Sequence, residues 1–381
     1  MIMKKKIFTS IGLMSGTSMD GVDLSVIKSD GNDQFSSICN TYKEFDDGLY
    51  KQLINLRDKI SNFKDLKTHS IEINDVEKKF TLFNSHLINE VIRDINEDID
   101  LIGFHGQTVF HDPKIQISKQ LGDGRLLSSL FKKIVINNFR QNDLNHGGQG
   151  APLTPIFHSL ISKIIQKNFK LKLPINIINI GGITNITRLI PGKKIIGWDS
   201  GPGNCLIDQC VQEFTAKKSQ FDNKGRIAKK GNIKDMTKII ESFLSSDYFQ
   251  ENLPKSQAII NFNFKKISRS KLKNHSFNDW ASAMTEITAL SIVRDLEKFC
   301  KAKKVEIYFC GGGSKNNFLI KRISDLLNED YEIKKINNLG IDPMLIEACT
   351  FAWLSKKRIK KEEINLLNST GAKPSLLGEI F

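Results

Sequence analysis

Residues 7–27, IFTSIGLMSGTSMDGVDLSVI, predict a β-hairpin. Two apolar runs, Ile7–Met14 and Val22–Ile27, flank a turn-like segment from Ser15 to Gly21. Gly, Ser, Thr and Asp are the usual residues of tight turns, but glycines also let backbone N–H groups point at an anion. The segment is therefore either a plain turn or a loop that binds phosphate.

The same pattern returns in the second half of the chain, in residues 175–190, INIINIGGITNITRLI. There Ile175–Ile180 and Ile186–Ile190 flank the glycine turn Gly181–Asn185. Each hairpin is followed by further predicted strands and helices. A duplicated unit in a chain of 381 residues predicts two similar α/β lobes with a cleft between them.

Hydrophobic periodicity supplies the other elements of these lobes. Apolar residues at steps of three and four from Val76 to Val91 predict a long helix. Further helices are predicted at Ala151–Ile165, Leu206–Phe214, Ala281–Phe299, Asn317–Leu327 and Pro343–Lys356, and further strands at Leu101–Phe104, Ile134–Asn138, Lys194–Trp198 and Val305–Phe309.

The composition excludes several classes of protein. The net charge is +14, but lysines dominate it and no basic patch is interleaved with aromatic residues, so no nucleic-acid partner is expected. No run of 18 apolar residues occurs, so no membrane partner is expected either. The six cysteines form no CxxC pair, which predicts reduced thiols in a cytoplasmic protein.

The first glycine turn has the donors that a nucleotide phosphate needs. Thr17 and Ser18 add hydroxyl groups to the amides around Gly16, and Asp20 could hold Mg²⁺ directly or through water, because hard cations prefer oxygen ligands. The chain contains no GxxxxGK[ST] motif and no complete GxGxxG motif, which argues against P-loop and dinucleotide-binding folds.

Two further glycine segments extend the predicted nucleotide site. Gly181, Gly182, Thr184 and Asn185 form the matching turn of the second lobe. The run Gly311-Gly312-Gly313 follows a predicted strand and precedes a helix. Consecutive glycines lose much backbone entropy on folding, so the run suits close approach to adenine or ribose, with a simple helix-start turn as the alternative.

Carboxylates beside glycines are candidate catalytic groups. Asp143 precedes Gly147-Gly148-Gln149-Gly150, and Asp199 precedes Ser200-Gly201-Pro202-Gly203-Asn204. Both are expected at strand ends, where a carboxylate in a cleft can act as a general base or can instead cap a helix or a turn. Glu347, early in the last predicted helix, has a solvated position at a helix start as its ordinary alternative.

Seven segments, in this order, resemble those of the anhydro-N-acetylmuramic acid kinases. They are GLMSGTSMDGVD (12–23), FHGQT (104–108), FRQNDLNHGGQGAPL (139–153), NIGGITNIT (179–187), GWDSGPGN (197–204), CGGGSKN (310–316) and EACTFAWL (347–354). The resemblance implies two duplicated ribonuclease-H-like domains of the actin-like ATPase superfamily around a central cleft. It also implies ATP-dependent opening of the 1,6-anhydro ring of anhydro-N-acetylmuramic acid, with phosphorylation to N-acetylmuramic acid 6-phosphate in murein recycling.

The resemblance also assigns residues to the site. The family's base falls on Asp199, with Asp143 and Glu347 as further catalytic candidates. The nucleotide loop falls on Gly16, Thr17, Ser18, Met19, Asp20, Gly21, Val22 and Asp23, and the sugar would meet His105, Gln107, Arg140, Gly201 and Asn204. One segment departs from the family pattern, because Leu144-Asn145-His146 stand where small residues are expected; His146 fits a spacer or surface residue better than a catalyst.

The expected organisation is a first lobe of residues 1–135, which residues 340–381 rejoin, and a second lobe of residues 136–339. The resemblance implies a homodimer. A kinase of the same fold acting on another sugar, and a non-catalytic ATP-driven clamp, remain the alternatives, because fold does not determine function.

Overall fold

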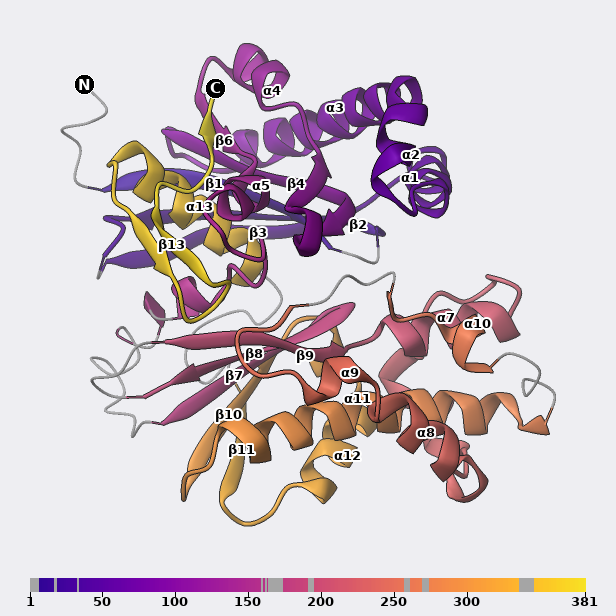
Figure 1. Ribbon diagram of the computed structural model, residues 1–381. Coiled ribbons are helices and arrows are strands. Elements are labelled where there is room, and N and C mark those ends of the chain that lie inside the picture. Colours follow the sequence, from indigo (N-terminus) through magenta and orange to yellow (C-terminus); the bar gives the residue numbers. More distant parts are fainter. Residues whose placement is uncertain are drawn as a thin grey trace. The chain divides into compact units, whose positions relative to one another are not determined.

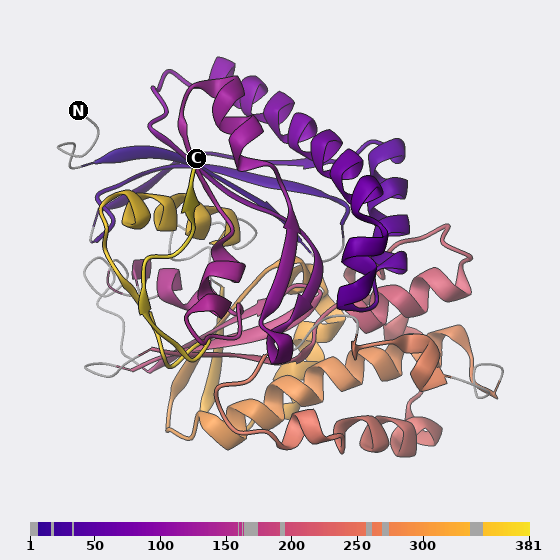
Figure 2. The same ribbon diagram turned by 45° about the horizontal axis from the view of Figure 1, so that its top comes forward.

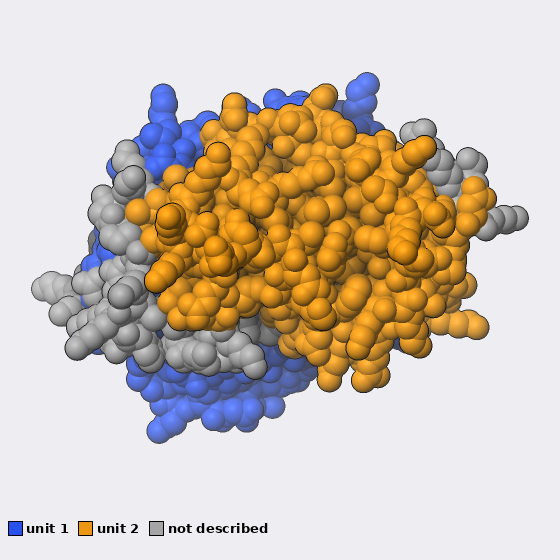
Figure 3. Space-filling view, turned by 90° about the horizontal axis from the view of Figure 1, so that it is seen from below, with its two compact units in different colours: residues 1–170, 345–381 blue, residues 171–344 orange. Residues whose placement is uncertain are grey.

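The computed structural model describes residues 7–16, 19–32, 34–158, 160–161, 163, 174–190, 195–256, 261–268, 274–335 and 346–381. The chain divides into two compact units, coloured separately in Figure 3. Unit 1 comprises residues 1–170 and 345–381, and unit 2 comprises residues 171–344. Among the described residues, no helix combines the length and the apolar composition needed to cross a bilayer.

Unit 1 contains more of the chain than the sequence led us to expect, because residues 136–170 belong to it rather than to the second lobe. Strand β6 (Ile134–Asn137) lies inside the first sheet, where it pairs with β4 (Leu101–Asp112) and with β14 (Glu379–Ile380). The short helix α5 (Phe139–Asn145) then packs against unit 1 as well. The expected boundary at 135/136 would cut these contacts.

The sheet of unit 1 has seven strands in the order β14-β6-β4-β1-β2-β3, with β5 paired to β4. The strands not yet defined are β1 (Phe8–Ser15), β2 (Gly21–Ser29), β3 (Phe35–Glu44) and β5 (Ile117–Leu121). Strands β1, β2 and β3 form an antiparallel meander, whereas β4 is parallel to β1 and β6 is parallel to β4. The hairpin predicted at residues 7–27 is confirmed.

The sheet of unit 2 repeats this arrangement with five strands in the order β11-β10-β7-β8-β9. They are β7 (Ile175–Ile180), β8 (Ile183–Leu189), β9 (Ile196–Pro202), β10 (Val305–Cys310) and β11 (Tyr331–Lys335). Strands β7, β8 and β9 are antiparallel neighbours, and β10 and β11 extend the sheet in parallel from β7. The order β11-β10-β7-β8-β9 matches β6-β4-β1-β2-β3 of unit 1, so the duplicated ribonuclease-H-like α/β fold is confirmed, and β14 and β5 are additional strands of unit 1.

Helices complete both units, as Figures 1 and 2 show. Unit 1 has α1 (Asp47–Lys59), α2 (Phe63–Thr68), α3 (Ser70–Asp94), α4 (Gly124–Phe131) and α13 (Ile346–Ile359), besides a small sheet of β12 (Ile364–Leu366) and β13 (Ala372–Ser375). Unit 2 has α7 (Cys205–Phe214), α8 (Thr237–Leu244), α9 (Asp247–Gln250), α10 (Phe264–Ser268), α11 (Phe277–Phe299) and α12 (Asn317–Leu326).

Most of the predicted helices are confirmed within a few residues. Of the helix expected at Ala151–Ile165, residues 155–158, 160, 161 and 163 are helical, and Ile164 and Ile165 lie outside the described residues. The last predicted helix begins at Ile346 in the structure, and Pro343 lies outside the described residues. All six cysteines are free thiols, as their spacing predicts.

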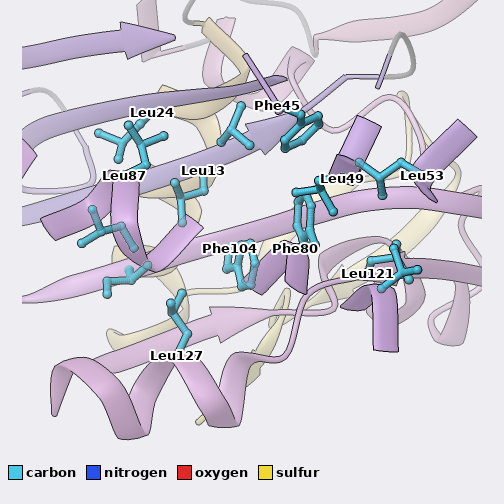
Figure 4. Close-up of a cluster of buried hydrophobic side chains, with 14 of the residues drawn as sticks. Leu13, Leu24, Phe45, Leu49, Leu53, Phe80, Leu87, Phe104, Leu121 and Leu127 are labelled. Carbon is cyan, nitrogen blue, oxygen red and sulfur yellow. The ribbon is translucent and has the colours of Figure 1, made fainter. Parts of the chain in front are cut away.

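The two faces of the first sheet are covered differently. Leu13 packs into a hydrophobic cluster with Leu24, Phe80 and Phe104, in which the rings of Phe80 and Phe104 are stacked (Figure 4). Gly12, the residue before Leu13 in β1, faces α13 on the opposite side of the sheet, because side chains alternate along a strand. A Cβ atom on Gly12 would lie 1.9 Å from the carbonyl oxygen of Ala348, so only glycine lets α13 come this close.

Helix α13 runs antiparallel to β1, which places its first turn toward the glycine turn of unit 1. Ala348, near the start of α13, contacts Gly12, near the middle of β1. Further along the helix, Trp353 Nε1 donates to the carbonyl oxygen of Gly31, beyond the end of β2 that pairs with the start of β1. The first turn of α13, with Glu347, therefore points toward Ser15.

In unit 2, α11 and α12 cover one face of the sheet. Ile178, Ile186 and Trp198 pack on this face with Ile292 and other apolar residues of the two helices. The alternate residues of the same strands, Asn179, Asn185 and Asp199, belong to the opposite face. This polar row lies opposite the hydrophobic core and is the first candidate for chemistry in unit 2.

Candidate active site

The glycine turn of unit 1 is held by Gln107, which lies beside Ser15 on the neighbouring parallel strand. Gln107 Nε2 donates to the carbonyl oxygen of Gly16 at 3.0 Å, and Ser15 Oγ lies 2.6 Å from Gln107 Oε1 and 2.8 Å from the carbonyl oxygen of Gly21. Gln107 is completely buried, so its side chain positions the turn rather than projecting toward a sugar as expected. Its place inside β4, not at a strand end, explains this.

The remaining residues of the turn divide into buried and exposed ones. Met19, with a left-handed φ of 58°, and Val22 have buried side chains in the core of unit 1. Asp20 is exposed and Asp23 is half-buried. Thr17 and Ser18 lie outside the described residues. Among the described positions, Asp20 is thus the most accessible carboxylate of the turn.

His105 and Arg140 form a second group in unit 1. Arg140 Nε donates to His105 Nε2 at 2.8 Å, and Arg140 Nη1 donates to the carbonyl oxygen of Gly150 at 2.9 Å. His105 Nδ1 lies 2.7 Å from the carbonyl oxygen of Gly106, which fixes the neutral tautomer with the proton on Nδ1. Burial and the Arg140 charge hold the pKa of His105 well below its usual range. His105 therefore orients the guanidinium as a neutral acceptor.

Asp143 lies in helix α5, not at a strand end as expected, and it is completely buried. Its Oδ1 accepts from Thr370 Oγ1 at 2.8 Å, and its Oδ2 accepts from the amide of Gly150 at 2.7 Å. Burial raises the pKa of Asp143, while these two hydrogen bonds lower it. The carboxylate thus fixes the Gly147–Gly150 turn, whose last carbonyl holds Arg140.

The three residues that follow Asp143 differ in burial. Leu144 is buried, whereas Asn145 and His146 are exposed, in agreement with the prediction that His146 is a surface residue. Glu347 is half-buried in the first turn of α13, the turn that points toward Ser15.

The glycine segments of unit 2 come together at the start of α7. The carbonyl oxygens of Gly181 and Gly182 accept from the amides of Asn204 and Gly203 at 2.8 and 2.9 Å. Gly311 has a left-handed φ of 77°, and a Cβ atom there would lie 2.4 Å from Asn179 Oδ1. Close contacts within unit 2 therefore require glycine at Gly311, whereas a Cβ atom on Gly181 or Gly312 would meet nothing closer than 3.6 or 3.8 Å. These two positions leave backbone accessible to a ligand such as a nucleotide phosphate.

The other residues of this cluster have more specific positions. A Cβ atom on Gly313 would lie 3.0 Å from Asn204 Oδ1, and one on Gly312 would lie 3.8 Å from Asn204 Nδ2, so Asn204 borders the glycine run. Gly201 and Thr184 are buried. Thr184 Oγ1 faces the carbonyl oxygen of Pro202 at 3.5 Å, which directs the hydroxyl inward.

Asp199 lies within β9, the edge strand, and not after its end as expected. Its amide donates to the carbonyl oxygen of Lys255 at 3.0 Å, and its own carbonyl oxygen accepts from Tyr248 Oη at 2.6 Å. Both main-chain groups therefore point away from β8. Because Asp199 is the cross-strand partner of Asn185, the two form the closer, non-hydrogen-bonded type of pair, with Cα atoms about 4.5 Å apart.

The side chains of this pair are both buried, Asp199 with 4% and Asn185 with 8% of its surface exposed. Asn185 is also the cross-strand partner of Asn179, which completes the polar row. Among the described residues, Asn185 Oδ1 has no hydrogen-bond partner. A buried acceptor of this kind is unfavourable unless a ligand or water donates to it. Asn185 was predicted in the nucleotide turn, whereas the strand register places it beside Asp199.

Three residues near Asp199 have no signal in the sequence. Tyr248, Lys255 and Asp295 are brought to β9 from separate segments by the fold. Burial, followed by the charges of Asp199 and Asp295, keeps the pKa of Tyr248 well above its usual range, so its phenol remains a donor. Burial raises the pKa of Asp295, while Lys255, Trp198 and Ser200 lower it.

Comparison with known proteins agrees with this architecture. The model of the family described as anhydro-N-acetylmuramic acid kinase matches residues 8–381. The chain is 40% identical to the anhydro-N-acetylmuramic acid kinase of Pelagibacter ubique, over 99% of both chains. It is 30% identical to that of Agrobacterium fabrum over 98% of both chains, and 32% identical to that of Pasteurella multocida over 100% of this chain and 98% of the other.

Similarity to solved structures is weaker. The component A of (R)-2-hydroxyglutaryl-CoA dehydratase from Acidaminococcus fermentans aligns with a TM-score of 0.43 and 10% identity, over 92% of this chain and 99% of that chain. The match of the family model over nearly the whole length, together with the identity to the curated relatives, leaves no ambiguity about kinship. The chain belongs to the anhydro-N-acetylmuramic acid kinase family.

Proposed function

We propose that this protein uses ATP and water to convert 1,6-anhydro-N-acetylmuramic acid into N-acetylmuramic acid 6-phosphate. Membership of the family supports the substrate and the reaction. The observation in the structure that carries the proposal is the polar row, in which the buried carboxylate of Asp199 lies beside a carboxamide oxygen with no partner among the described residues. The row is on the same unit as the clustered glycine segments.

The chemistry requires a base for water rather than for a sugar hydroxyl. In a 1,6-anhydro sugar the 6-oxygen is bonded to the anomeric carbon, so it has no proton to lose. Water attacks the anomeric carbon, the bond from that carbon to the 6-oxygen breaks, and the 6-oxygen takes the γ-phosphoryl group of ATP. ADP leaves, and the proton of the attacking water passes to Asp199. General-base catalysis of such a step is typically worth about 10²–10⁴-fold in rate.

The polar row can orient this water. A water molecule has two hydrogens and needs its lone pair directed at the anomeric carbon. The Asp199 carboxylate would accept one hydrogen, and Asn185 Oδ1 would accept the other. Two fixed acceptors define the direction of the lone pair, which is the positioning contribution to catalysis.

The glycine segments would hold ATP. In unit 2 the phosphates would face Gly181 and Gly182, and the adenosine would face Gly311–Gly313. In unit 1 the turn from Gly16 to Asp23 would contact the phosphates, with Asp20 as a ligand of Mg²⁺. A bound Mg²⁺ would neutralise charge on the transferred phosphoryl group. Gly181 and Gly312 fit such a ligand, because a Cβ atom at either position would meet nothing closer than 3.6 Å.

The residues of unit 1 would hold the sugar. Arg140, oriented by His105 and Gly150, has the geometry to bind the carboxylate of the lactyl group that distinguishes muramic acid. Asp143 would act indirectly by fixing Gly150, and Glu347, in the first turn of α13, would be a further catalytic group. By resemblance to the family, the protein would be a homodimer and would act in the cytoplasm.

An isotope experiment tests the proposal. Purified protein, γ-labelled ATP and 1,6-anhydro-N-acetylmuramic acid are combined in H₂¹⁸O, beside a panel of ordinary amino sugars and hexoses. The expected product carries ¹⁸O on the anomeric carbon and none in the phosphoryl group. Transfer only to an ordinary sugar would establish the alternative kinase. ATP turnover without any phosphorylated sugar would favour the non-catalytic clamp.

A further inference from the structure

An ion pair between Lys255 and Asp295 is buried beside β9 and has no part in the chemistry above. Lys255 is completely buried and Asp295 is 3% exposed. Lys255 Nζ lies 3.1 Å from Asp295 Oδ1 and 3.0 Å from Asp295 Oδ2. Two apolar residues of similar volume usually stabilise a fold as well as a buried ion pair does, because burial removes both charges from water. Stability alone does not account for the pair.

The contacts of this pair converge on Asp199 and its two neighbours. Asp295, on α11, accepts from Trp198 Nε1 at 2.8 Å, and Ser200 Oγ donates to the carbonyl oxygen of Ser291, one turn earlier on α11, at 3.0 Å. Lys255 accepts from the amide of Asp199 through its own carbonyl oxygen. Strand β9 is thereby held at the residues before and after Asp199, whose carboxylate faces away from α11.

Tyr248 completes this attachment. Its hydroxyl donates to the carbonyl oxygen of Asp199 at 2.6 Å, and Lys255 Nζ lies 4.9 Å from the centre of its ring. The free side of β9 would otherwise have no neighbouring strand, since β9 is the edge of the sheet. The register of β8 and β9 also shifts at Ser200, and such bulges change the direction of adjacent side chains.

We propose that Asp295, Lys255 and Tyr248 are positioning residues that fix the direction of the Asp199 carboxylate. The inference rests on the proposed function, in which Asp199 is the base. Asp295 holds the strand from the helical face, and Lys255 and Tyr248 hold its main chain from the open edge. A displacement of a catalytic group by about 1 Å can lower a rate by about 100-fold, so a base on an edge strand needs this support.

The test replaces the ion pair by apolar residues. The double variant Lys255→Met/Asp295→Leu avoids leaving one buried charge without its partner, which would unfold the protein for an unrelated reason. We expect the variant to remain folded, with kcat for anhydro-sugar phosphorylation about 10- to 100-fold lower and KM for ATP within about threefold of the parent. An unchanged kcat in the folded variant overturns the inference.

The same pair of substitutions in an Asp199→Asn background distinguishes positioning from a separate effect. If the pair acts only through Asp199, its removal there changes the residual rate by less than about twofold, because groups that act as a unit are not additive. A further loss as large as in the parent contradicts the inference. If the parent protein itself does not phosphorylate the anhydro sugar, the proposed function fails instead, and the two failures are thereby distinguished.

Two further variants provide a control and a second test. Glu286→Gln removes another ion pair of α11, with Arg322, and should leave kcat unchanged even if it lowers the melting temperature. Tyr248→Phe removes only the hydroxyl that reaches Asp199 and decides the question should the double variant fail to fold. A kcat about fivefold or more below the parent supports the inference, and an unchanged kcat overturns it.

Discussion

Asn185 and Asp199 are direct cross-strand partners on the open face of the second sheet, and the carboxamide oxygen of Asn185 has no hydrogen-bond partner among the described residues. A carboxylate oxygen and a carboxamide oxygen both accept hydrogen bonds, and neither donates one. A water molecule can donate one hydrogen to each of them. The pairing is therefore the part of the structure that connects most directly with a hydrolytic step.

The first prediction concerns Asn185. Replacing it by alanine removes the second acceptor of the water, so kcat should fall about 10- to 100-fold with little change in KM for either substrate. Steady-state kinetics on the purified variant measures this. The substitution also removes a buried oxygen without a partner, so the rate loss should not be accompanied by unfolding. An Asn185→Ala enzyme with the parent kcat would exclude the two-acceptor arrangement.

The second prediction concerns the approach of α13 to β1. In Gly12→Ala the new methyl carbon would lie 1.9 Å from the carbonyl oxygen of Ala348, so the helix must move. Overpacking of this kind typically costs about 1–3 kcal/mol, and a clash with rigid backbone belongs at the upper end. Urea denaturation measures the free energy of unfolding. Gly48→Ala, on the exposed side of α1, is the control: its Cβ atom would meet only the Asp46 carboxylate, at 3.0 Å, and this side chain can shift, so the change in stability should be far smaller than for Gly12→Ala.

The third prediction is a loss of stability in mild acid. Burial lowers the pKa values of His105, His111 and His158, the latter two to about 3. In the unfolded chain each histidine titrates near 6.5, so only the unfolded state gains protons below that pH. Stability from these groups is complete above pH 6.5 and is lost at about 1.4 kcal/mol per pH unit per histidine as the pH falls.

Denaturant unfolding between pH 7.5 and 5 measures this slope. The raised pKa values of the buried carboxyls Asp143 and Asp295 act in the opposite direction, so the net loss should be smaller than the sum over three histidines. His158 lies outside the proposed site. In His158→Gln the slope of the free energy of unfolding against pH should be smaller by about 1.4 kcal/mol per pH unit, the contribution of one histidine. A His158→Gln variant with the same pH slope as the parent would show that His158 is not held neutral by burial.

The fourth prediction concerns Asp143. Asp143→Ala leaves the hydroxyl of Thr370 and the amide of Gly150 without their acceptor, which should cost about 1–3 kcal/mol of stability. The looser Gly150 no longer fixes Arg140, so KM for the sugar should rise while KM for ATP stays the same. Thr370→Val removes one of the two hydrogen bonds and should show a smaller change in the same direction. A rise in both KM values would contradict this role.

Local patterns in the sequence account for much of the fold. The two hairpins, α3 and α11 follow from alternation and from three-to-four-residue periodicity, because one face of each element is buried. The duplicated topology follows from the repeated glycine hairpin. The domain boundary was wrong because β6 and α5 pair with the C-terminal segment, and such long-range pairing leaves no trace in local periodicity.

The site was predicted in outline only. Asp199 and the glycine segments were recognisable from composition and spacing. Gln107 was expected to contact the sugar. Its strand instead continues to Asp112 and pairs with β5, so Gln107 is buried within the sheet and donates a hydrogen bond to Gly16 in the glycine turn. Tyr248, Lys255 and Asp295 could not be found, because their function depends on burial and contact with β9 rather than on any motif.

The central claim is that Asp199 is the general base for the attacking water. The most direct test is a single-turnover measurement on Asp199→Asn with 1,6-anhydro-N-acetylmuramic acid, with ATP binding measured separately by calorimetry. We predict that ring opening and phosphoryl transfer fall together by about 10²–10⁴-fold while ATP affinity changes by less than about threefold. A near-normal rate of ring opening in Asp199→Asn would contradict the claim.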